Sequence, residues 1–517
     1  MNRFFGCGEK TSRFNESRLK DVYGEFIDTS FEDATIAGHS LSWWVDNFGI
    51  PLHINYTPLI RKNIRAFKRI FEENYPNGKI LYAAKAYCHP SIFRVLYEEG
   101  VGADVSSYNE TKAALESGIL PGDLNLNGNA KEDFLITQAV EQDILITIDS
   151  MEELDLVSGI ASSMGKTVRV LLRVSGFESK SGTDECILTS GVWTKFGISP
   201  ETIKERLKNA QIISGIKICG LHMHVGSQIA RKEDFLDPLG VLIELGHFLR
   251  SNGHECSIIN IGGGFPLSYM NETEWSDFKE SVKIGMMHAE KGDFTKLYVW
   301  NNETSGYCPS YGEDLEFTDW KGEMFYSPYP KSKMLEEILK GTIEVNGNKI
   351  NTIAALKELG TPQILIEPGR SIVGDTGITL ARVSNVKKIA YGHNLLVLEM
   401  GVVNYAGSVI HKLLNGWSIV NDYTRMEEKP FEAFVCGNLC YNGDIIAKYK
   451  IKLQRTPKRG DIVMIYDTGG TESHFFASNA NSYPCPSRVL VDENGSVTVV
   501  KRRDSQNEIF GLQELIR

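Results

Sequence analysis

The sequence predicts an α/β fold: a (β/α)8 TIM-like barrel followed by a mainly β C-terminal domain. Two observations lead to this prediction. Eight short apolar or β-branched runs recur between residues 79 and 369, and amphipathic stretches with a helical period lie between them. After residue 385 the helical period gives way to alternation of apolar and polar residues. Strands that alternate with helices indicate βαβ units and a parallel sheet, and eight such units are typical of a closed barrel.

The eight predicted barrel strands are short and mostly apolar. A doubly wound sheet is the alternative, and the number of strands argues against it. Stretches such as "SIFRVLYEEG", "NETKAALESG" and "KEDFLITQAVEQD" are the helices predicted between them. In chain order the strands are "KILYAAKA", "GADVSS", "LNLNGN", "ILITIDS", "RVLLRV", "GLHMHVG", "SIINIGGG" and "QILIEPG".

Polar or glycine-rich residues stand where these strands end. In a barrel the carboxyl ends of all strands face one mouth, where active sites lie. Helix capping explains single cases, since Asp149-Ser150 also fits an N-cap, but it does not explain all eight. The strand-end residues are Lys85, Asp104, Asn127, Asp149, Arg173, His224, Gly262 to Gly264, and Glu367.

The domain boundaries follow from the same change of period. We expect an N-terminal segment at 1–57 whose strand "PLHINYT" joins the β domain, a barrel at 58–385, and a C-terminal β domain at 386–517. Residues 267–360 are too long for a βα connection and are read as the seventh barrel helix plus an insertion. "SRVLVDENGSVTVVKRR" predicts a hairpin in which Asn494-Gly495 form a type I′ turn.

Composition excludes several classes of protein. The chain has 517 residues, 42% hydrophobic and 23% charged, and its net charge of −11 comes without a basic run, which argues against nucleic acid as a partner. No apolar run is long enough for a membrane helix, and the first residues lack a signal-peptide core. Nine cysteines without CxxC spacing support neither a disulfide framework nor a metal site. A cytoplasmic enzyme is therefore expected.

Lys85 raises the question of chemistry, because lysine is rarely buried without a partner. One reading is an exposed strand end, and the other is a lysine that is covalently bonded. Gly262 to Gly264 form a glycine-rich turn after a strand, which suits a phosphate. "EPGR" adds the carboxylate of Glu367 and the guanidinium of Arg370. Lysine, phosphate cradle and carboxylate are the set that pyridoxal 5′-phosphate requires.

The chain resembles the diaminopimelate/ornithine decarboxylase family, whose members have an alanine-racemase-like barrel. The resemblance runs from about Leu41 to the C-terminus, interrupted by the long insertion. Six motifs in the order typical of that family carry it: "YAAKA", "GADVSSYNE", "LHMHVGSQI", "NIGGGFP", "EPGR" and "CGNLCYNGD". The resemblance implies a homodimeric pyridoxal-phosphate-dependent decarboxylase with shared active sites.

By this resemblance Lys85 forms the Schiff base, His224 stacks on the pyridine face, and Glu367 keeps the pyridine nitrogen protonated. His222 is expected to point to the opposite face from His224. Cys440 would act in the neighbouring subunit as an acid, or would position one. The remaining residues implied for the cofactor are Asp104, Glu110, Arg173, Ser227, Gly262, Gly263, Gly264, Gly369 and Arg370.

The sequence departs from the family at positions that are expected to bind the substrate. Tyr441 follows Cys440 where an acidic residue is usual, although Asp444 is retained, and Gly469-Gly470-Thr471 replaces a Gly-Ala-Tyr. Arg370, Tyr441 and Asp444 are the candidate substrate-binding residues. We therefore expect Cα decarboxylation of a non-standard amino acid. The alternatives are a racemase or epimerase, which Glu367 disfavours, and a non-catalytic regulator, which the retained site residues disfavour.

Overall fold

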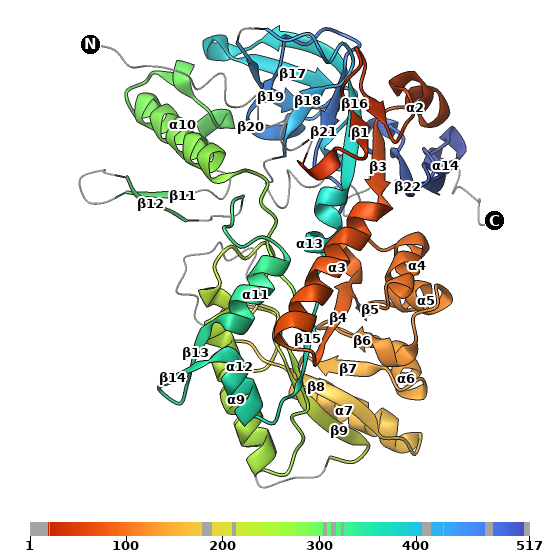
Figure 1. Cartoon of the computed structure of the whole chain (residues 1–517), viewed down its shortest axis with the longest axis vertical. Coiled ribbons are helices and arrows are strands. Elements are labelled where there is room, and N and C mark those ends of the chain that lie inside the picture. Colours follow the sequence, from red (N-terminus) through yellow and green to blue (C-terminus); the bar gives the residue numbers. More distant parts are fainter. Residues whose placement is uncertain are drawn as a thin grey trace, which may run out of the picture. The chain divides into compact units, whose positions relative to one another are not determined.

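The computed structural model describes residues 19, 21–177, 189–208, 213–302, 308–311, 317–321, 325–405, 415–427, 429–470 and 479–510. They divide into two compact units, which are treated separately (Figure 1). The barrel unit comprises Arg61–Leu267 and Gly322–Ile372. The β unit comprises the residues up to Ile60, Ser268–Lys321, and those from Val373 onward. In the described part, no helix is long and apolar enough to cross a membrane.

The barrel unit contains a closed barrel of parallel strands in the order β10-β15-β4-β5-β6-β7-β8-β9. Its interior is filled by apolar side chains that include Leu81, Leu145, Leu171 and Leu365. All eight predicted strands are present, so the predicted fold class is confirmed. The strands are β4 (Gly78–Ala83), β5 (Gly102–Val105), β6 (Leu124–Leu126), β7 (Leu145–Ile148), β8 (Val168–Arg173), β9 (Ile216–His222), β10 (Ile258–Asn260) and β15 (Gln363–Ile366).

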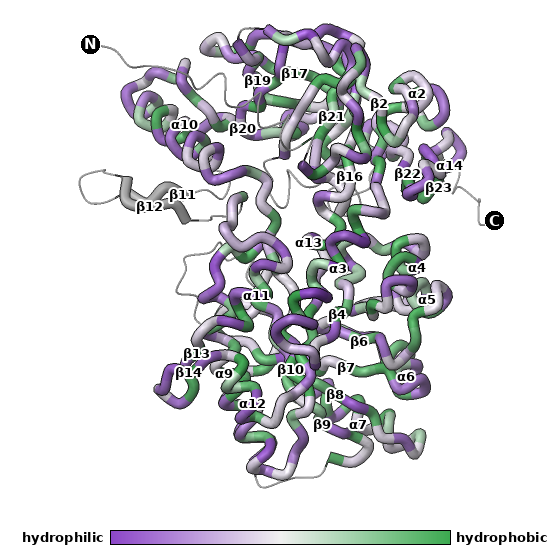
Figure 2. Tube along the Cα trace, viewed as in Figure 1, coloured by the Kyte–Doolittle hydropathy of each residue, from purple (hydrophilic) through white to green (hydrophobic). Residues whose placement is uncertain are grey.

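Helices follow the barrel strands, and each buries one apolar face. In α4, Ile92, Phe93 and Leu96 are buried, and Figure 2 shows hydrophobic and hydrophilic residues interspersed along the helices of this unit. Serine caps begin three of the helices, because their hydroxyls accept the free amides of the first turn. The helices are α3 (Thr57–Asn74), α4 (Pro90–Glu98), α5 (Tyr108–Glu116), α6 (Asp133–Glu141), α7 (Met151–Ser163), α8 (Pro200–Leu207), α9 (Glu233–Ser251), α11 (Ser332–Lys340), α12 (Thr352–Glu358) and α13 (Arg370–Val373).

The β unit is built on a nine-stranded sheet whose main path is β20-β19-β17-β16-β3-β22-β23, with β18 and β21 paired beside it. Its core packs against the short helix α2 (Leu41–Phe48), where Trp44 is fully buried. The strands are β3 (Leu52–Tyr56), β16 (Gly377–Lys388), β17 (Asn394–Leu398), β18 (Trp417–Ile419), β19 (Phe431–Cys436), β20 (Ile445–Leu453), β21 (Ile462–Ile465), β22 (Ser487–Val491) and β23 (Val497–Lys501).

The unit boundaries differ from those expected. The β unit resumes at Val373, not at 386, because β16 pairs with β3 and β21. The first five residues of β16 are all buried, the polar Thr379 included, so this half of the strand does not have the one exposed face expected of the β domain. The insertion is also divided. Helix α10 (Glu272–Glu290) belongs to the β unit, whereas α11 and α12 belong to the barrel unit.

The predicted hairpin forms between β22 and β23, but the predicted type I′ turn was wrong. A type I′ turn needs positive φ at both central residues. Only Gly495 has one, at +76°, and its amide donates to the carbonyl oxygen of Asp492. The turn therefore spans Asp492 to Gly495, with glycine at its left-handed end.

A buried ion pair in the β unit allows a test of stability. The guanidinium of Arg455, 2% exposed, donates from Nη1 to Asp461 Oδ2 at 2.7 Å and from Nη2 to the Asn421 carbonyl oxygen. We expect Asp461→Ala to lower the free energy of unfolding by about 3–5 kcal/mol, because the arginine charge would stay buried without its partner. Glu73→Ala, which removes an exposed pair with Arg69, should cost less than about 1 kcal/mol.

The same pair predicts the direction of a pH effect. Burial raises the pKa of Asp461, but hydrogen bonds from Arg455 and Asn421 outweigh it and hold that pKa below the ordinary 3.8. A carboxyl with a lowered folded-state pKa stabilises the fold above its unfolded pKa, and this stabilisation is lost as the pH falls. Urea unfolding should therefore show that the difference between wild type and Asp461→Ala shrinks below about pH 4. A pH-independent difference would contradict this assignment.

Candidate active site at the barrel mouth

The carboxyl ends of the barrel strands carry a set of charged and polar side chains. Lys85 follows β4, Asp104 lies in β5, Arg173 ends β8, His224 follows β9, and Glu367 follows β15. The last four are all buried, at 8% exposure or less. Because parallel strands of a barrel end at one mouth, residues as far apart in the sequence as Lys85 and Glu367 interact electrostatically. Among the described residues, no cluster of His, Cys, Asp and Glu has the arrangement of a metal site.

Lys85 does not lie in the apolar strand itself. It is the central residue of a 3-10 turn, Ala84–Ala86, that directly follows β4, and its side chain is exposed while both neighbouring alanines are buried. This agrees with the reading of Lys85 as an exposed residue at a strand end, whereas the 3-10 turn itself was not predicted because the strand and the turn share one apolar run. Lys85 makes no hydrogen bond or ion pair with the described residues, yet its charge acts on Asp104, His224 and Glu367. An amine with a free nitrogen therefore faces a buried acidic pair.

Glu367 is the centre of a buried hydrogen-bond network. Its Oε1 accepts from Asn260 Nδ2 at 2.7 Å and lies 3.1 Å from His222 Nε2. Asn260 Oδ1 in turn accepts the Gly262 amide, so the network ties Glu367 to the glycine turn after β10. The Asn260 donor fixes the orientation of the carboxylate, and His222 adds a second donor when its ring proton is on Nε2.

Asp104 forms the second carboxyl of the site. Its Oδ1 accepts from Asn125 Nδ2 at 2.8 Å and from Asn127 Nδ2 at 3.2 Å. Burial, followed by the charge of Glu367, raises the pKa of Asp104 to about 7. Burial also raises the pKa of Glu367. Two buried carboxyls in contact cannot both be fully ionised, so this pair holds a proton near neutral pH.

Both histidines of "LHMHVG" face this network, and the expectation that His222 points away was wrong. His222 is fully buried and reaches Glu367, while His224 Nδ1 lies 3.9 Å from Glu367 Oε2. Side chains alternate along a strand, so residues two apart share a face. The alternation in the sequence thus contained the signal that was misread.

His224 is held as a neutral ring. Its Nδ1 accepts the backbone amide of Gly263 at 3.0 Å, which leaves the ring proton on Nε2. Burial, followed by the charges of Lys85 and Arg173, lowers the pKa of His224 well below its usual value. The 3.9 Å approach to Glu367 is therefore not an ion pair.

Arg173 is positioned from two sides. Its Nη1 lies 3.3 Å from Asp149 Oδ1, and its guanidinium stacks over Phe196 at 4.2 Å from the ring centre. Asp149 is thus a partner of Arg173, whereas the cap of α7 is Ser150, whose hydroxyl accepts the Glu153 amide. Phe196 carried no signal in the sequence, because an aromatic residue in a loop has many possible roles.

Three neighbouring strands supply a cradle suited to an anion. Ser227 follows β9, Gly262 to Gly264 follow β10, and Gly369-Arg370 follow β15. Gly262 and Gly264 have φ of +69° and +97°, and a Cβ on Gly263 would lie 2.3 Å from the Glu367 carbonyl oxygen. Only glycine therefore permits this close backbone turn.

Arg370 shows that the cradle is fitted to a negative group. Its Nη2 donates to Ser227 Oγ at 3.2 Å, but its Nε and Nη1, although buried, have no hydrogen-bond partner among the described residues. Buried guanidinium donors normally find acceptors. A phosphate here would satisfy them, and the lysine, the cradle and the carboxylate together fit pyridoxal phosphate.

The remaining predicted residues lie elsewhere. Glu110 accepts from the amide and hydroxyl of Ser106 and so closes the start of α5. Cys440 and Tyr441 lie in the β unit, exposed at the tip between β19 and β20. Asp444 is buried there, and its carboxylate accepts the amides of Val402 at 2.5 Å and Leu439 at 2.8 Å. Thr471 lies outside the described residues.

Comparisons with known proteins agree with this geometry. Residues 60–291 match the family model "Pyridoxal-dependent decarboxylase, pyridoxal binding domain". A diaminopimelate decarboxylase of Staphylococcus aureus is 28% identical over 92% of this chain and 97% of its own length. One of Archaeoglobus fulgidus is 26% identical over 95% of this chain and 99% of its own.

A solved structure extends the likeness to the fold. The diaminopimelate decarboxylase of M. jannaschii in complex with L-lysine superposes with a TM-score of 0.73 at 21% identity, over 95% of this chain and 98% of that one. Family model, full-length relatives and fold agree with the lysine, cradle and carboxylate found at the barrel mouth. The family model and the full-length relatives therefore make this chain similar to the fold-type III pyridoxal-phosphate-dependent decarboxylases, the family of the diaminopimelate and ornithine decarboxylases.

Proposed function

We propose that this chain binds pyridoxal phosphate through Lys85 and removes the α-carboxylate of an amino acid as carbon dioxide. The observation that carries the proposal is the exposed Lys85 beside buried Glu367, with the unpartnered Arg370 donors marking an anion cradle. When bound, the cofactor supplies the electron sink for the bond to the departing carboxylate.

The protein residues have separate roles in this proposal. Arg370, Ser227 and the glycine turn would hold the phosphate. Glu367, oriented by Asn260 and His222, would keep a proton on the pyridine nitrogen, and a protonated ring withdraws electrons most strongly. Alanine racemases of similar fold are known for an arginine at that place, so the carboxylate favours decarboxylation over racemisation.

The first prediction concerns cofactor attachment. Purified wild-type protein should show a visible absorption band, and Lys85→Ala should lose it because no other described residue at the mouth offers a free amine. Lys79→Ala, at the start of β4 and paired with Asp123, should keep the band. A band that survives in Lys85→Ala would remove the proposed attachment site.

The second part of the proposal is a homodimer with shared sites. Cys440 is exposed on its own chain, and the turn that presents it is fixed by the two amide contacts of Asp444. An exposed thiol on a fixed turn is suited to act in a neighbouring subunit, where it could deliver or position a proton.

Mixing two inactive variants tests this sharing. When subunits of Lys85→Ala and Cys440→Ala exchange at random, half of the dimers are hybrids, and each hybrid has one intact site of its two. The mixture should therefore regain about one quarter of wild-type activity. Lys85→Ala mixed with a variant that carries both Lys85→Ala and Cys440→Ala should regain no activity, because neither chain supplies Lys85. Absence of activity after verified subunit exchange would contradict the shared site.

The third part of the proposal is a substrate without a simple distal ammonium. Tyr441 is 65% exposed and cannot supply a carboxylate. Asp444, the other candidate, already uses both carboxylate oxygens on backbone amides, so turning it toward a substrate would leave those amides unpaired. A neutral or larger distal group is therefore proposed. Tyr307 and Tyr311, in the aromatic-rich part of the insertion, are proposed to contact that group, and their side chains lie outside the described part.

The kinetic constant kcat/KM for ornithine, lysine and diaminopimelate tests this specificity. Tyr441→Glu should raise it by roughly ten- to a hundredfold, the value of a charge-assisted hydrogen bond. Tyr441→Gln, whose side chain is similar in size to glutamate but uncharged, should not raise kcat/KM. Efficient wild-type turnover of any of the three, unimproved by the glutamate, would show that Tyr441 does not determine specificity.

A further inference from the structure

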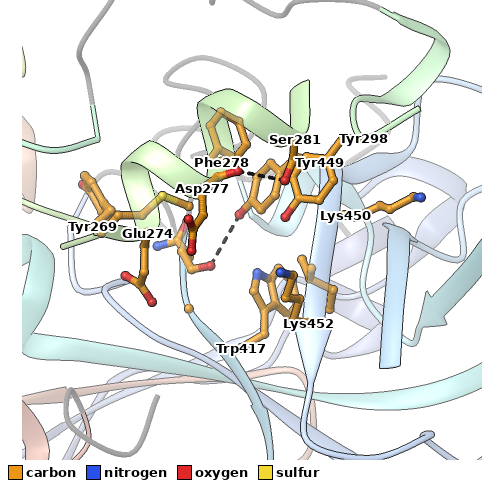
Figure 3. A pocket seen from close by; sticks show the side chains of 14 residues that line it. Tyr269, Glu274, Asp277, Phe278, Ser281, Tyr298, Trp417, Tyr449, Lys450 and Lys452 are labelled. Carbon is orange, nitrogen blue, oxygen red and sulfur yellow. Dashed lines mark hydrogen bonds between the residues drawn. The ribbon is translucent and has the colours of Figure 1, made fainter. Parts of the chain in front are cut away.

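The β unit contains a pocket that the proposed reaction does not use. It lies between helix α10 and the strands β18 and β20, and its volume is about 90 Å³ (Figure 3). One water needs about 10–15 Å³ measured in this way, so the pocket has room for a head group of a few heavy atoms. Helix α10 comes from the insertion that the sequence marked as unusually long.

The walls of the pocket are largely aromatic and are held in place. Phe278 of α10 packs edge-on against Tyr298 and Tyr449, with ring centres 5.7 and 6.2 Å apart. The backbone joins the same elements, since the Lys450 amide donates to the Tyr298 carbonyl oxygen at 3.0 Å. Trp417, 3% exposed, forms another wall. Rigid aromatic faces of this kind attract cations.

One carboxylate in the pocket is uncommitted. Asp277, half-buried on α10, makes no side-chain hydrogen bond or ion pair with the described residues, and Figure 3 shows it facing the space beside Tyr449. Glu274, one turn earlier, is already used, because its Oε2 accepts the Asn271 amide in the capping box of α10. Asp277 is thus the group left to pair with a ligand.

The lysines at the rim of the pocket do not pair with Asp277. Lys452 Nζ lies 3.6 Å from Glu432, which is not part of the pocket. Lys450 Nζ stands over the ring of Phe434, also outside the pocket. Within the pocket, the Tyr449 hydroxyl donates to the Asn415 carbonyl oxygen at 3.4 Å and accepts a hydrogen bond from Trp417, so one lone pair remains as an acceptor.

From the free carboxylate, the acceptor oxygens and the aromatic faces together, we propose that this pocket binds a small organic cation, an alkylammonium group, with Asp277 as its counter-ion. The site is separate from the residues assigned to catalysis. Amines are also the class of compound that amino-acid decarboxylation produces, so occupancy by such a ligand would be a route for product to regulate the enzyme.

Calorimetric titration of the holoenzyme with n-butylammonium chloride tests the site, and n-butanol is the matched uncharged probe. We expect saturable binding of the cation alone. Asp277→Asn should weaken it by roughly ten- to a hundredfold, because a charge-assisted contact is lost. Glu280→Gln, which removes an exposed carboxylate from the same helix, should leave it unchanged.

A second arm separates this site from the barrel mouth. Binding should persist in Lys85→Ala, even if that variant is inactive, so failure of the proposed reaction and failure of this site are distinguishable. Absence of saturation up to about 10 mM, an affinity weaker than about 3 kcal/mol, would show a hydrated cleft only. Binding that Asp277→Asn leaves unchanged, or that disappears in Lys85→Ala, would equally overturn the proposal.

Discussion

Closure of the parallel barrel is the constraint on which the candidate site depends. Because β15 pairs with both β10 and β4, Glu367 is brought between the glycine turn after β10 and the lysine turn after β4. No local sequence signal could place these three features together. The same closure buries Glu367, so its hydrogen bonds to Asn260 and His222 form without competition from water.

Burial also sets the protonation of the site. Three carboxyls, two histidines and two arginines lie at the mouth with little exposure, and charges there shift the pKa values of Asp104 and His222. Burial lowers the pKa of His222 to about 3, so both histidines are neutral and the acidic pair keeps a proton. The positive charge that remains comes from Arg173, Arg370 and Lys85. Such an arrangement suits an anionic ligand whose ring nitrogen is protonated.

The β unit contributes groups of a different kind. Its exposed thiol stands on a turn fixed by Asp444, which the sequence alone could read equally well as a substrate contact. The insertion adds helix α10 to this unit and, with it, an aromatic pocket that contains Asp277, whose carboxylate has no hydrogen-bond or ion-pair partner among the described residues. A segment that looked like an extended barrel connection therefore changes the surface of the other unit.

The sequence by itself determined the barrel and predicted which residues would hold a cofactor, because strand–helix alternation is local and each motif is contiguous. It also located Lys85, Glu367 and Arg370 at strand ends. The tertiary structure decided what those residues touch. The start of strand β16 was not recognised because it is buried by pairing with β3 and β21, and the shared face of His222 and His224 was misjudged. The sequence could not show that the Asp444 carboxylate accepts the amides of Leu439 and Val402, because only packing brings Val402 near it.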